Sequence, residues 1–201
     1  MKKIAILLSS IVSVSAFAQF ETTKENASFG AGQVVTLEQK NKFDLTGNAL
    51  KVGAFMPSVQ LMTSDLTSYD TSAESENIKI YSILTSVDTP VCVQQAVDLS
   101  NYVQSHDELK GIEFYALSAD TPFAQQRFIK EHDLDGVTYL SDSLDHKFGL
   151  KTGSLIKQLG LLTRSIIVVD KNNQIIYLQR VPELTTIPDL EAAIKVAQSR
   201  L

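Results

Sequence analysis

The chain has 201 residues, a formal net charge of −5 and a single cysteine. This length is enough for one domain with a substantial hydrophobic core. The acidic charge argues against binding to nucleic acid or to an anionic membrane surface. A single cysteine cannot form an internal disulfide, so Cys92 is inert, paired with another chain, or used in chemistry.

The N-terminal end has the pattern of a secretory signal peptide. Two lysines near the start precede an apolar stretch over 4–14, and residues 16–18 are Ala-Phe-Ala, a typical cleavage sequence. An uncleaved membrane anchor is the alternative, but the apolar stretch is shorter than a spanning helix needs. We therefore expect a signal peptide over 1–18, cleavage after Ala18, and no membrane association afterwards. In a Gram-negative cell such a protein is periplasmic.

The rest of the chain alternates strand-like and helix-like segments, without a repeat or a second domain. We expect a flexible mature N-terminus over 19–28 and one domain over 29–201. Runs of β-branched and aromatic residues predict strands over 34–37, 42–45, 59–62, 66–69, 78–84, 112–117, 137–140, 165–169 and 175–178. Proline and apolar spacing predict helices from Pro90, over 122–128, over 142–148 and from Pro188 to about 199. The first two strands should form a hairpin, and 149–160 should be a long loop.

Cys92 lies where a predicted strand passes into a predicted helix. Thr89 is a preferred N-cap residue, and Pro90 fits the first helical position, where its missing N–H costs nothing. Cys92 then falls in the first turn, where free backbone N–H groups and the positive end of the helix dipole favour an anion. A free cysteine is more commonly a small buried apolar residue, but this position favours a reactive thiolate.

Several segments resemble one known protein family. Residues 88–92, Asp-Thr-Pro-Val-Cys, resemble the peroxidatic-cysteine loop of the thiol peroxidase branch of the peroxiredoxins. Further matches to that branch occur, in the family's order, at 52–57, 117–128, 163–170 and 182–193. The resemblance covers most of the chain from about Phe29 onward. It implies, and the order of elements fits, an α/β thioredoxin-like fold with a central mixed sheet flanked by helices and an N-terminal β-hairpin.

Three residues are candidates for the chemistry. Cys92 is the candidate nucleophile, and the hydroxyl of Thr89 can donate a hydrogen bond to a peroxide oxygen while Thr89 also acts as an ordinary helix cap. Arg164 taken alone would be a surface residue at a strand end, but the resemblance implies that it stabilises the thiolate and the transition state. The resemblance also implies a homodimer. We expect no cofactor and no metal, since the three histidines lack metal-like spacing.

Two positions depart from the family pattern. Ile129 occupies the position where thiol peroxidases usually carry a second, resolving cysteine. Thr85 stands where the family usually has a proline that shields the sulfur, which puts the efficiency of the site in question. Without an internal partner, a sulfenic acid on Cys92 must be reduced from outside the chain, by a thioredoxin-like protein or a small thiol.

We therefore expect an exported thiol peroxidase that reduces hydrogen peroxide and organic hydroperoxides through Cys92 and an external thiol. Two alternatives stay open: a catalytically weakened redox sensor that forms a mixed disulfide with a partner protein, and a binding module of the same fold. Retention of Thr89 and Arg164 together with Cys92 favours the enzyme. The residues Thr85 and Ile129 favour the alternatives.

Overall fold

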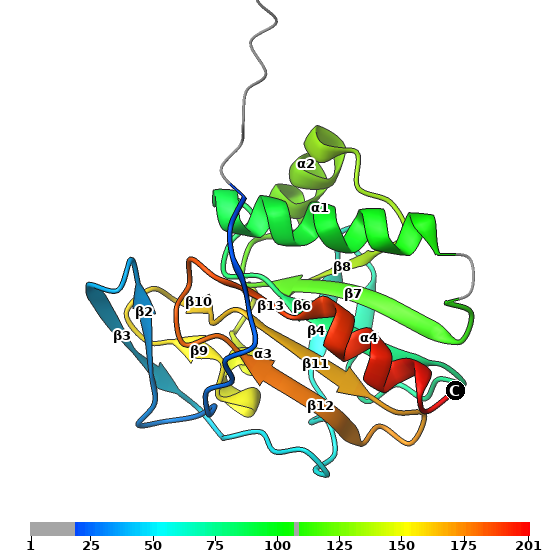
Figure 1. Ribbon diagram of the computed structural model, residues 1–201, viewed down its shortest axis with the longest axis horizontal. Coiled ribbons are helices and arrows are strands. Elements are labelled where there is room, and N and C mark those ends of the chain that lie inside the picture. Colours follow the sequence, from blue (N-terminus) through cyan, green and yellow to red (C-terminus); the bar gives the residue numbers. More distant parts are fainter. Residues whose placement is uncertain (1–18, 107–108) are drawn as a thin grey trace, which may run out of the picture.

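The computed structural model describes residues 19–106 and 109–201 (Figure 1). The expected signal peptide over 1–18 lies outside these residues, so its cleavage and the export of the protein stay predictions. Within the described ranges, no helix is both long enough and apolar enough to cross a membrane.

A seven-stranded mixed sheet forms the centre of the domain. β6 (Ile78–Ile83), β7 (Ile112–Ser118) and β8 (Thr138–Ser141) run parallel, because helical connections join them. Antiparallel strands extend both edges: β11 (Ser165–Val169), β12 (Ile175–Arg180), β4 (Gln60–Thr63) and β5 (Ser68–Asp70). The strand order is β12-β11-β6-β7-β8-β4-β5. The expected central mixed sheet is confirmed.

Helices pack on both faces of this sheet because alternate strand residues point to opposite sides. Leu99 and Ile194, from two different helices, pack with Ile80 of β6 on one face, and Phe148 packs with Tyr81 of β6 on the other. α1 lies between α2 and α4 (Figure 1). The helices are α1 (Pro90–Ser105), α2 (Pro122–His132), α3 (Lys147–Thr152) and α4 (Leu190–Gln198).

A second, smaller sheet contains the N-terminal hairpin. Its strands, in spatial order, are β10 (Leu161–Leu162), β9 (Leu155–Ile156), β3 (Asn41–Thr46) and β2 (Val34–Leu37). The expected hairpin of β2 and β3 is confirmed. The expectation of a long loop over 149–160 is wrong, because that range holds the end of α3 and β9, which pairs with β3. A two-residue strand is too short to leave a periodic signal in the sequence.

Two helices start later than expected, and in each an aspartate before the helix accepts hydrogen bonds from N–H groups of the first turn. In the third helix, the carboxylate of Asp142 accepts hydrogen bonds from the N–H groups of Phe148 and Gly149, both at 2.9 Å. Before the last helix, Pro188 pairs in a short strand, and Asp189 is the N-cap. Asp142 and Pro188, which we expected to begin the two helices, therefore lie before them.

The segment 19–28, expected to be flexible, is instead hydrogen-bonded to the domain along its length. β1 (Thr22–Thr23) pairs in parallel with β13 (Ile187–Pro188). The N–H of Phe20 donates to Oε1 of Gln94 on α1 at 2.8 Å. In Figure 1 this blue segment runs across the domain from β12 to the start of α1. Its polar composition could not reveal these contacts, because all the partners are distant in sequence.

Glu183 joins the N-terminal hairpin to the C-terminal part of the chain. Its carboxylate accepts hydrogen bonds from the N–H groups of Glu38 and Gln39, both at 2.9 Å, and from the hydroxyl of Thr36 at 2.6 Å. Glu38 and Gln39 have φ values of 55° and 56°, a left-handed conformation that costs energy in residues other than glycine. The carboxylate of Glu183 offsets this cost because it binds the amides that this turn exposes.

We predict that Glu183→Gln destabilises the fold at neutral pH and matters less in acid. Burial opposes the charge, but the hydrogen bonds outweigh it and hold the pKa of the Glu183 carboxyl below its usual value. A lowered folded pKa gives stability that is present at neutral pH and lost as the pH falls through that pKa. We expect the free energy of unfolding to drop by about 1–3 kcal/mol at pH 7.

Denaturant unfolding of parent and variant across the acidic range measures this difference. The matched control is Glu38→Gln, on the exposed side of the same turn, which should behave as the parent. A loss of stability in Glu183→Gln that stays constant down to low pH would contradict the role of the charge.

Candidate active site

The turn between β6 and α1 carries the candidate nucleophile. As the sequence predicts, Thr89 is the N-cap of α1, with φ −121° and ψ 140°, and Pro90 begins the helix. The hydroxyl of Thr89 does not cap the helix. It donates instead to the carbonyl oxygen of Ser86 at 3.1 Å. This hydrogen bond closes the turn over 86–89 and holds the side chain of Thr89 in one orientation.

Cys92 lies in the first turn of α1 and is fully buried, with no exposed surface. It packs in a cluster with Val87, Phe128 and Tyr139. The backbone N–H of Ser86 donates a hydrogen bond to its Sγ atom at 3.4 Å. A backbone N–H aimed at the sulfur stabilises negative charge there. The turn that precedes the helix thus both shields the sulfur and provides it with a donor.

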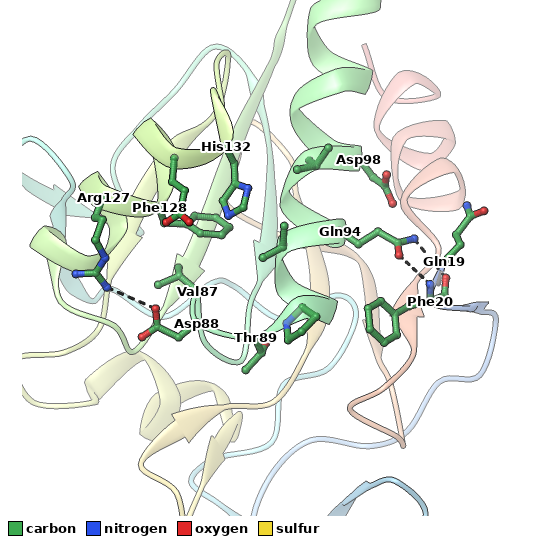
Figure 2. Close-up of a pocket in the computed structure, with 14 residues that line it drawn as sticks. Gln19, Phe20, Val87, Asp88, Thr89, Gln94, Asp98, Arg127, Phe128 and His132 are labelled. Atoms are coloured by element: carbon green, nitrogen blue, oxygen red, sulfur yellow. Dashed lines mark hydrogen bonds and ion pairs between the residues drawn. The ribbon is translucent and has the colours of Figure 1, made fainter. Parts of the chain in front are cut away.

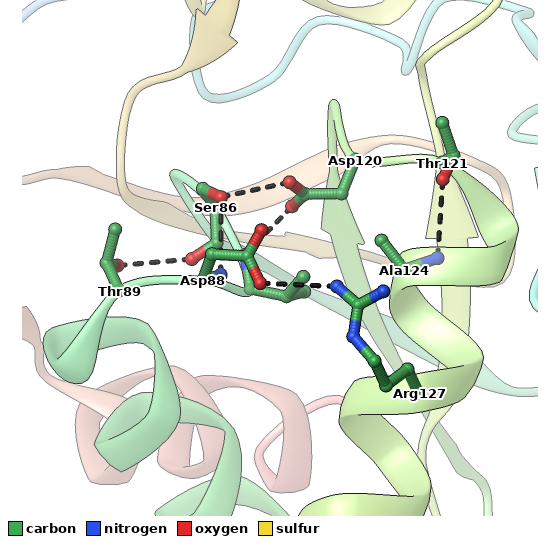
Figure 3. A network of polar contacts seen from close by, with 8 residues as sticks. Ser86, Asp88, Thr89, Asp120, Thr121, Ala124 and Arg127 are labelled. Carbon is green, nitrogen blue, oxygen red and sulfur yellow. Dashed lines mark hydrogen bonds and ion pairs between the residues drawn. The ribbon is translucent and has the colours of Figure 1, made fainter.

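Asp120, which follows β7, fastens this turn to the neighbouring strand. One carboxylate oxygen accepts from the hydroxyl of Ser86 at 2.9 Å, and the other accepts from the N–H of Val87 at 2.8 Å (Figure 3). Nearby, Asp88 and Arg127 form an ion pair at 3.5 Å whose side chains are both largely exposed. An exposed pair contributes little stability, so Asp120 is the residue that fixes the turn.

Arg164 is almost fully buried, at 1% exposure, and reaches toward α1. Its Nη1 donates to Oε1 of Gln95 at 2.6 Å, and its Nε donates to the carbonyl oxygen of Leu184 at 3.2 Å. Gln95 lies one helical turn after Cys92. No carboxylate in the described part of the chain lies within 4.0 Å of the Arg164 guanidinium. The structure therefore brings a buried, uncompensated cation to the helical turn next to the cysteine.

Gln95 is a site residue that the sequence analysis missed. Its Nε2 donates to the hydroxyl of Ser82 on β6 at 2.7 Å, while its Oε1 accepts from Arg164. The side chain is only 4% exposed. The available signal was that Gln95 follows Cys92 by three residues and so lies on the same side of the helix. Buried polar groups need partners, but the sequence could not name Arg164 as that partner.

A groove lies beside this site, between α1 and α2 (Figure 2). Its volume is about 930 Å³, and its lining combines apolar side chains such as Val93 and Phe128 with the charged groups of Asp98 and Glu131. Thr89 lines the groove, whereas Cys92 and Arg164 do not. Figure 2 also shows the backbone of Phe20 held by the side chain of Gln94 at one end.

Ile129, at the position where the family usually has a resolving cysteine, lies close to the apolar surroundings of Cys92. It lies on α2 and packs, partly buried, against the hydrophobic cluster that contains Cys92.

The described residues contain no group of three His, Cys, Asp or Glu side chains that could hold a metal ion. The candidate site itself offers a buried thiol, a threonine hydroxyl and a buried guanidinium.

Residues 51–194 match the model of the Redoxin family. Over 161 residues the chain is 35% identical to a thiol peroxidase of Staphylococcus saprophyticus, covering 80% of this chain and 95% of the relative. Over 155 residues it is 34% identical to a thiol peroxidase of Bacillus subtilis, covering 77% of this chain and 91% of the relative.

Solved structures agree with these relatives. A peroxiredoxin-like protein from Aquifex aeolicus superposes with a TM-score of 0.77 at 27% identity, covering 86% of this chain and 99% of the other. A thiol peroxidase from Chromobacterium violaceum superposes with a TM-score of 0.74 at 21% identity, covering 84% and 97%, and supports the fold alone. The chain therefore belongs to the peroxiredoxin family, with a thioredoxin-like fold, and is a thiol peroxidase.

Proposed function

We propose that this thiol peroxidase reduces hydrogen peroxide and organic hydroperoxides through Cys92 as its only redox-active group. The observation that carries the proposal is the arrangement around the first turn of α1. The sulfur is buried and accepts an N–H from Ser86, and the uncompensated cation Arg164 is tethered to Gln95 one turn away.

The oxidation step balances without any cofactor. The thiolate of Cys92 attacks one peroxide oxygen, the S–O bond forms, and the O–O bond breaks. The other oxygen leaves as hydroxide or alkoxide and takes a proton from water. Sulfur is oxidised to the sulfenic acid, and the peroxide is reduced to water or an alcohol.

Arg164 and Thr89 have distinct tasks in this proposal. The guanidinium of Arg164 has five N–H donors, of which one on Nε and one on Nη1 bind Leu184 and Gln95. The remaining donors can stabilise negative charge as the O–O bond breaks. From the sequence we expected Thr89 to donate to a peroxide oxygen, but its hydroxyl donates to the carbonyl oxygen of Ser86. Its oxygen can instead accept the hydrogen bond that a peroxide O–H offers.

Recycling must come from an external thiol, because the chain has no second cysteine. One thiol condenses with the sulfenic acid and releases water, and a second thiol then frees Cys92 as the resulting disulfide leaves. A thioredoxin-like protein or a small thiol can serve. Because Cys92 is fully buried, the first turn of α1 must open locally before a thiol reaches the sulfur.

We also propose where the mature protein acts and how it assembles. We place the mature protein in the periplasm, because the signal-peptide pattern over 1–18 predicts export. A homodimer fits the family. The full burial of Cys92 favours one alternative, a redox sensor, because slow reduction by free thiols lets the oxidised state persist until a partner protein binds. Rapid peroxide turnover with a simple dithiol favours the enzyme, whereas a stable mixed disulfide with a partner protein favours the sensor.

We predict that Cys92→Ser abolishes peroxide reduction and that Arg164→Lys slows it about a hundredfold, because an ammonium lacks the forked donors of a guanidinium. The measurement is the second-order rate constant for the reaction with hydrogen peroxide. Full reactivity in Arg164→Lys would make Arg164 a structural residue only, and residual activity in Cys92→Ser would place the chemistry elsewhere.

We also predict that Gln95→Leu lowers the peroxide rate constant about tenfold, because it frees Arg164 from α1. It should also reduce the free energy of unfolding by about 1–3 kcal/mol, since a buried donor loses its partner. Gln95→Glu keeps an acceptor for Arg164 but sets a carboxylate against the guanidinium, so it should not restore the parent rate constant.

The matched control for this experiment is Gln104→Leu. Gln104 lies later on α1, is exposed, and donates to Ser100 at 2.9 Å. It should leave the peroxide rate constant unchanged. If Gln95→Leu loses stability but keeps the parent rate constant, then Gln95 supports the fold without positioning Arg164.

A further inference from the structure

The turn over 86–89, which covers the sulfur, has few polar contacts with the rest of the domain. Most of its hydrogen bonds are internal or run to α1. The N–H and the hydroxyl of Thr89, for example, both donate to the carbonyl oxygen of Ser86. Among the described residues, only Asp120 and Arg127 bind this turn through polar atoms from outside β6 and α1. These two residues therefore decide how firmly polar contacts hold the turn.

The two contacts differ in strength. Arg127 pairs with Asp88 at 3.5 Å, and both side chains are largely exposed, so water and salt weaken the attraction. The half-buried carboxylate of Asp120 accepts from the hydroxyl of Ser86 at 2.9 Å and from the N–H of Val87 at 2.8 Å. Hydrogen bonds to an ionised acceptor are stronger than those between neutral groups. Asp120 is therefore the main polar anchor of the turn.

Asp120 is itself fixed to two strands of the central sheet. Its carbonyl oxygen accepts from the hydroxyl of Ser141 on β8 at 2.6 Å, and its N–H donates to the hydroxyl of Ser118 on β7 at 3.4 Å. The same Ser118 hydroxyl accepts from Nε2 of the buried Gln125 at 3.0 Å. The anchor therefore stays with the sheet when the turn moves.

The groove between α1 and α2 lies on the other side of the turn from the sulfur. Val87 and Phe128 line this groove, and both also pack in the hydrophobic cluster that contains Cys92. Cys92 does not line the groove. The side chains of Val87 and Phe128 therefore belong both to the wall of the groove and to the apolar surroundings of the sulfur.

We propose that Asp120 is a positioning residue that sets the balance between a closed and an open state of this turn. In the closed state it holds the N–H of Ser86 against the sulfur of Cys92, which favours attack on peroxide. In the open state its two hydrogen bonds are broken, Val87 leaves the cluster, and an external thiol reaches the sulfur through the groove. Asp120 therefore speeds oxidation and slows recycling. This inference rests on the proposed function of Cys92.

The test measures three rates in Asp120→Ala and Asp120→Asn. These are the reaction of Cys92 with hydrogen peroxide, its alkylation by N-ethylmaleimide, and the reduction of its sulfenic acid by dithiothreitol. Alanine removes both acceptor oxygens, so the peroxide rate should fall about tenfold, and the other two rates should rise about tenfold because the turn opens more often. Asparagine keeps one acceptor oxygen and can donate to the hydroxyl of Ser86, so its effects should be smaller.

Ser86→Ala tests whether Asp120 acts through this turn. It removes one of the two hydrogen bonds to Asp120, so it should change the three rates in the same directions as Asp120→Ala but less. The double variant should match Asp120→Ala, because the hydroxyl of Ser86 has already lost its partner there. Asp120→Asn and Ser86→Ala also decide the question if Asp120→Ala does not fold.

Two matched controls separate this role from a loss of overall stability. Asp88→Ala removes the exposed carboxylate of the same turn and should keep all three rates. Thr71→Val removes a buried hydroxyl that binds the N–H of Val59 at 2.9 Å and the carbonyl oxygen of Pro57 at 2.6 Å. It should lower the melting temperature and also keep the three rates, because local opening at one site is independent of a loss elsewhere.

The inference requires the peroxide rate and the alkylation rate to change in opposite directions. Unchanged rates would show that the turn is held without Asp120, and a change confined to one rate would contradict the two-state balance. A joint fall would mean that Cys92 itself is disturbed, and a joint rise would mean that burial alone limits its reactions. Failure of the proposed function is distinguishable, because alkylation reports the opening of the turn even if the parent protein does not react with peroxide faster than a free thiol.

Discussion

The buried charge of Arg164 is the feature on which the rest of the site depends. A cation removed from water is costly unless it is paired, yet the guanidinium is bound by two neutral acceptors, Gln95 on α1 and the carbonyl of Leu184. A carboxylate at this position would neutralise the charge. Neutral acceptors orient the guanidinium and leave its charge available for the negative charge that develops on a peroxide.

Two carboxylates keep the elements around Arg164 in place without touching its charge. Asp120 binds the turn that covers Cys92, through Ser86 and Val87. Glu183 binds the N-terminal hairpin and directly precedes Leu184, whose carbonyl accepts from Arg164. The loop that contains Glu183 and Leu184 therefore anchors both the small sheet and the guanidinium of Arg164. The site rests on contacts between segments distant in sequence, which explains why stability and reactivity should change together at several of these positions.

The sequence predicts most elements of the central sheet, because their strands are runs of β-branched and aromatic residues, and it places Thr89, Pro90 and Cys92 correctly at the start of α1. Prediction from the sequence fails where contacts with distant segments of the chain decide the structure. Short β9 exists only because β3 lies beside it, and segment 19–28 is ordered by hydrogen bonds to distant strands. For the same reason Gln95 was missed, since nothing local indicates that its amide meets Arg164.

Mass spectrometry of the protein after a short pulse of one equivalent of hydrogen peroxide, with dimedone present to trap sulfenic acid, tests whether Cys92 is an activated nucleophile. The proposed function predicts a dimedone adduct on Cys92 in the parent, formed even when an equal concentration of a small free thiol competes for the peroxide. If Cys92 stays unmodified while the competing thiol is consumed, then Ser86, Gln95 and Arg164 do not activate the sulfur, and the proposed function is wrong.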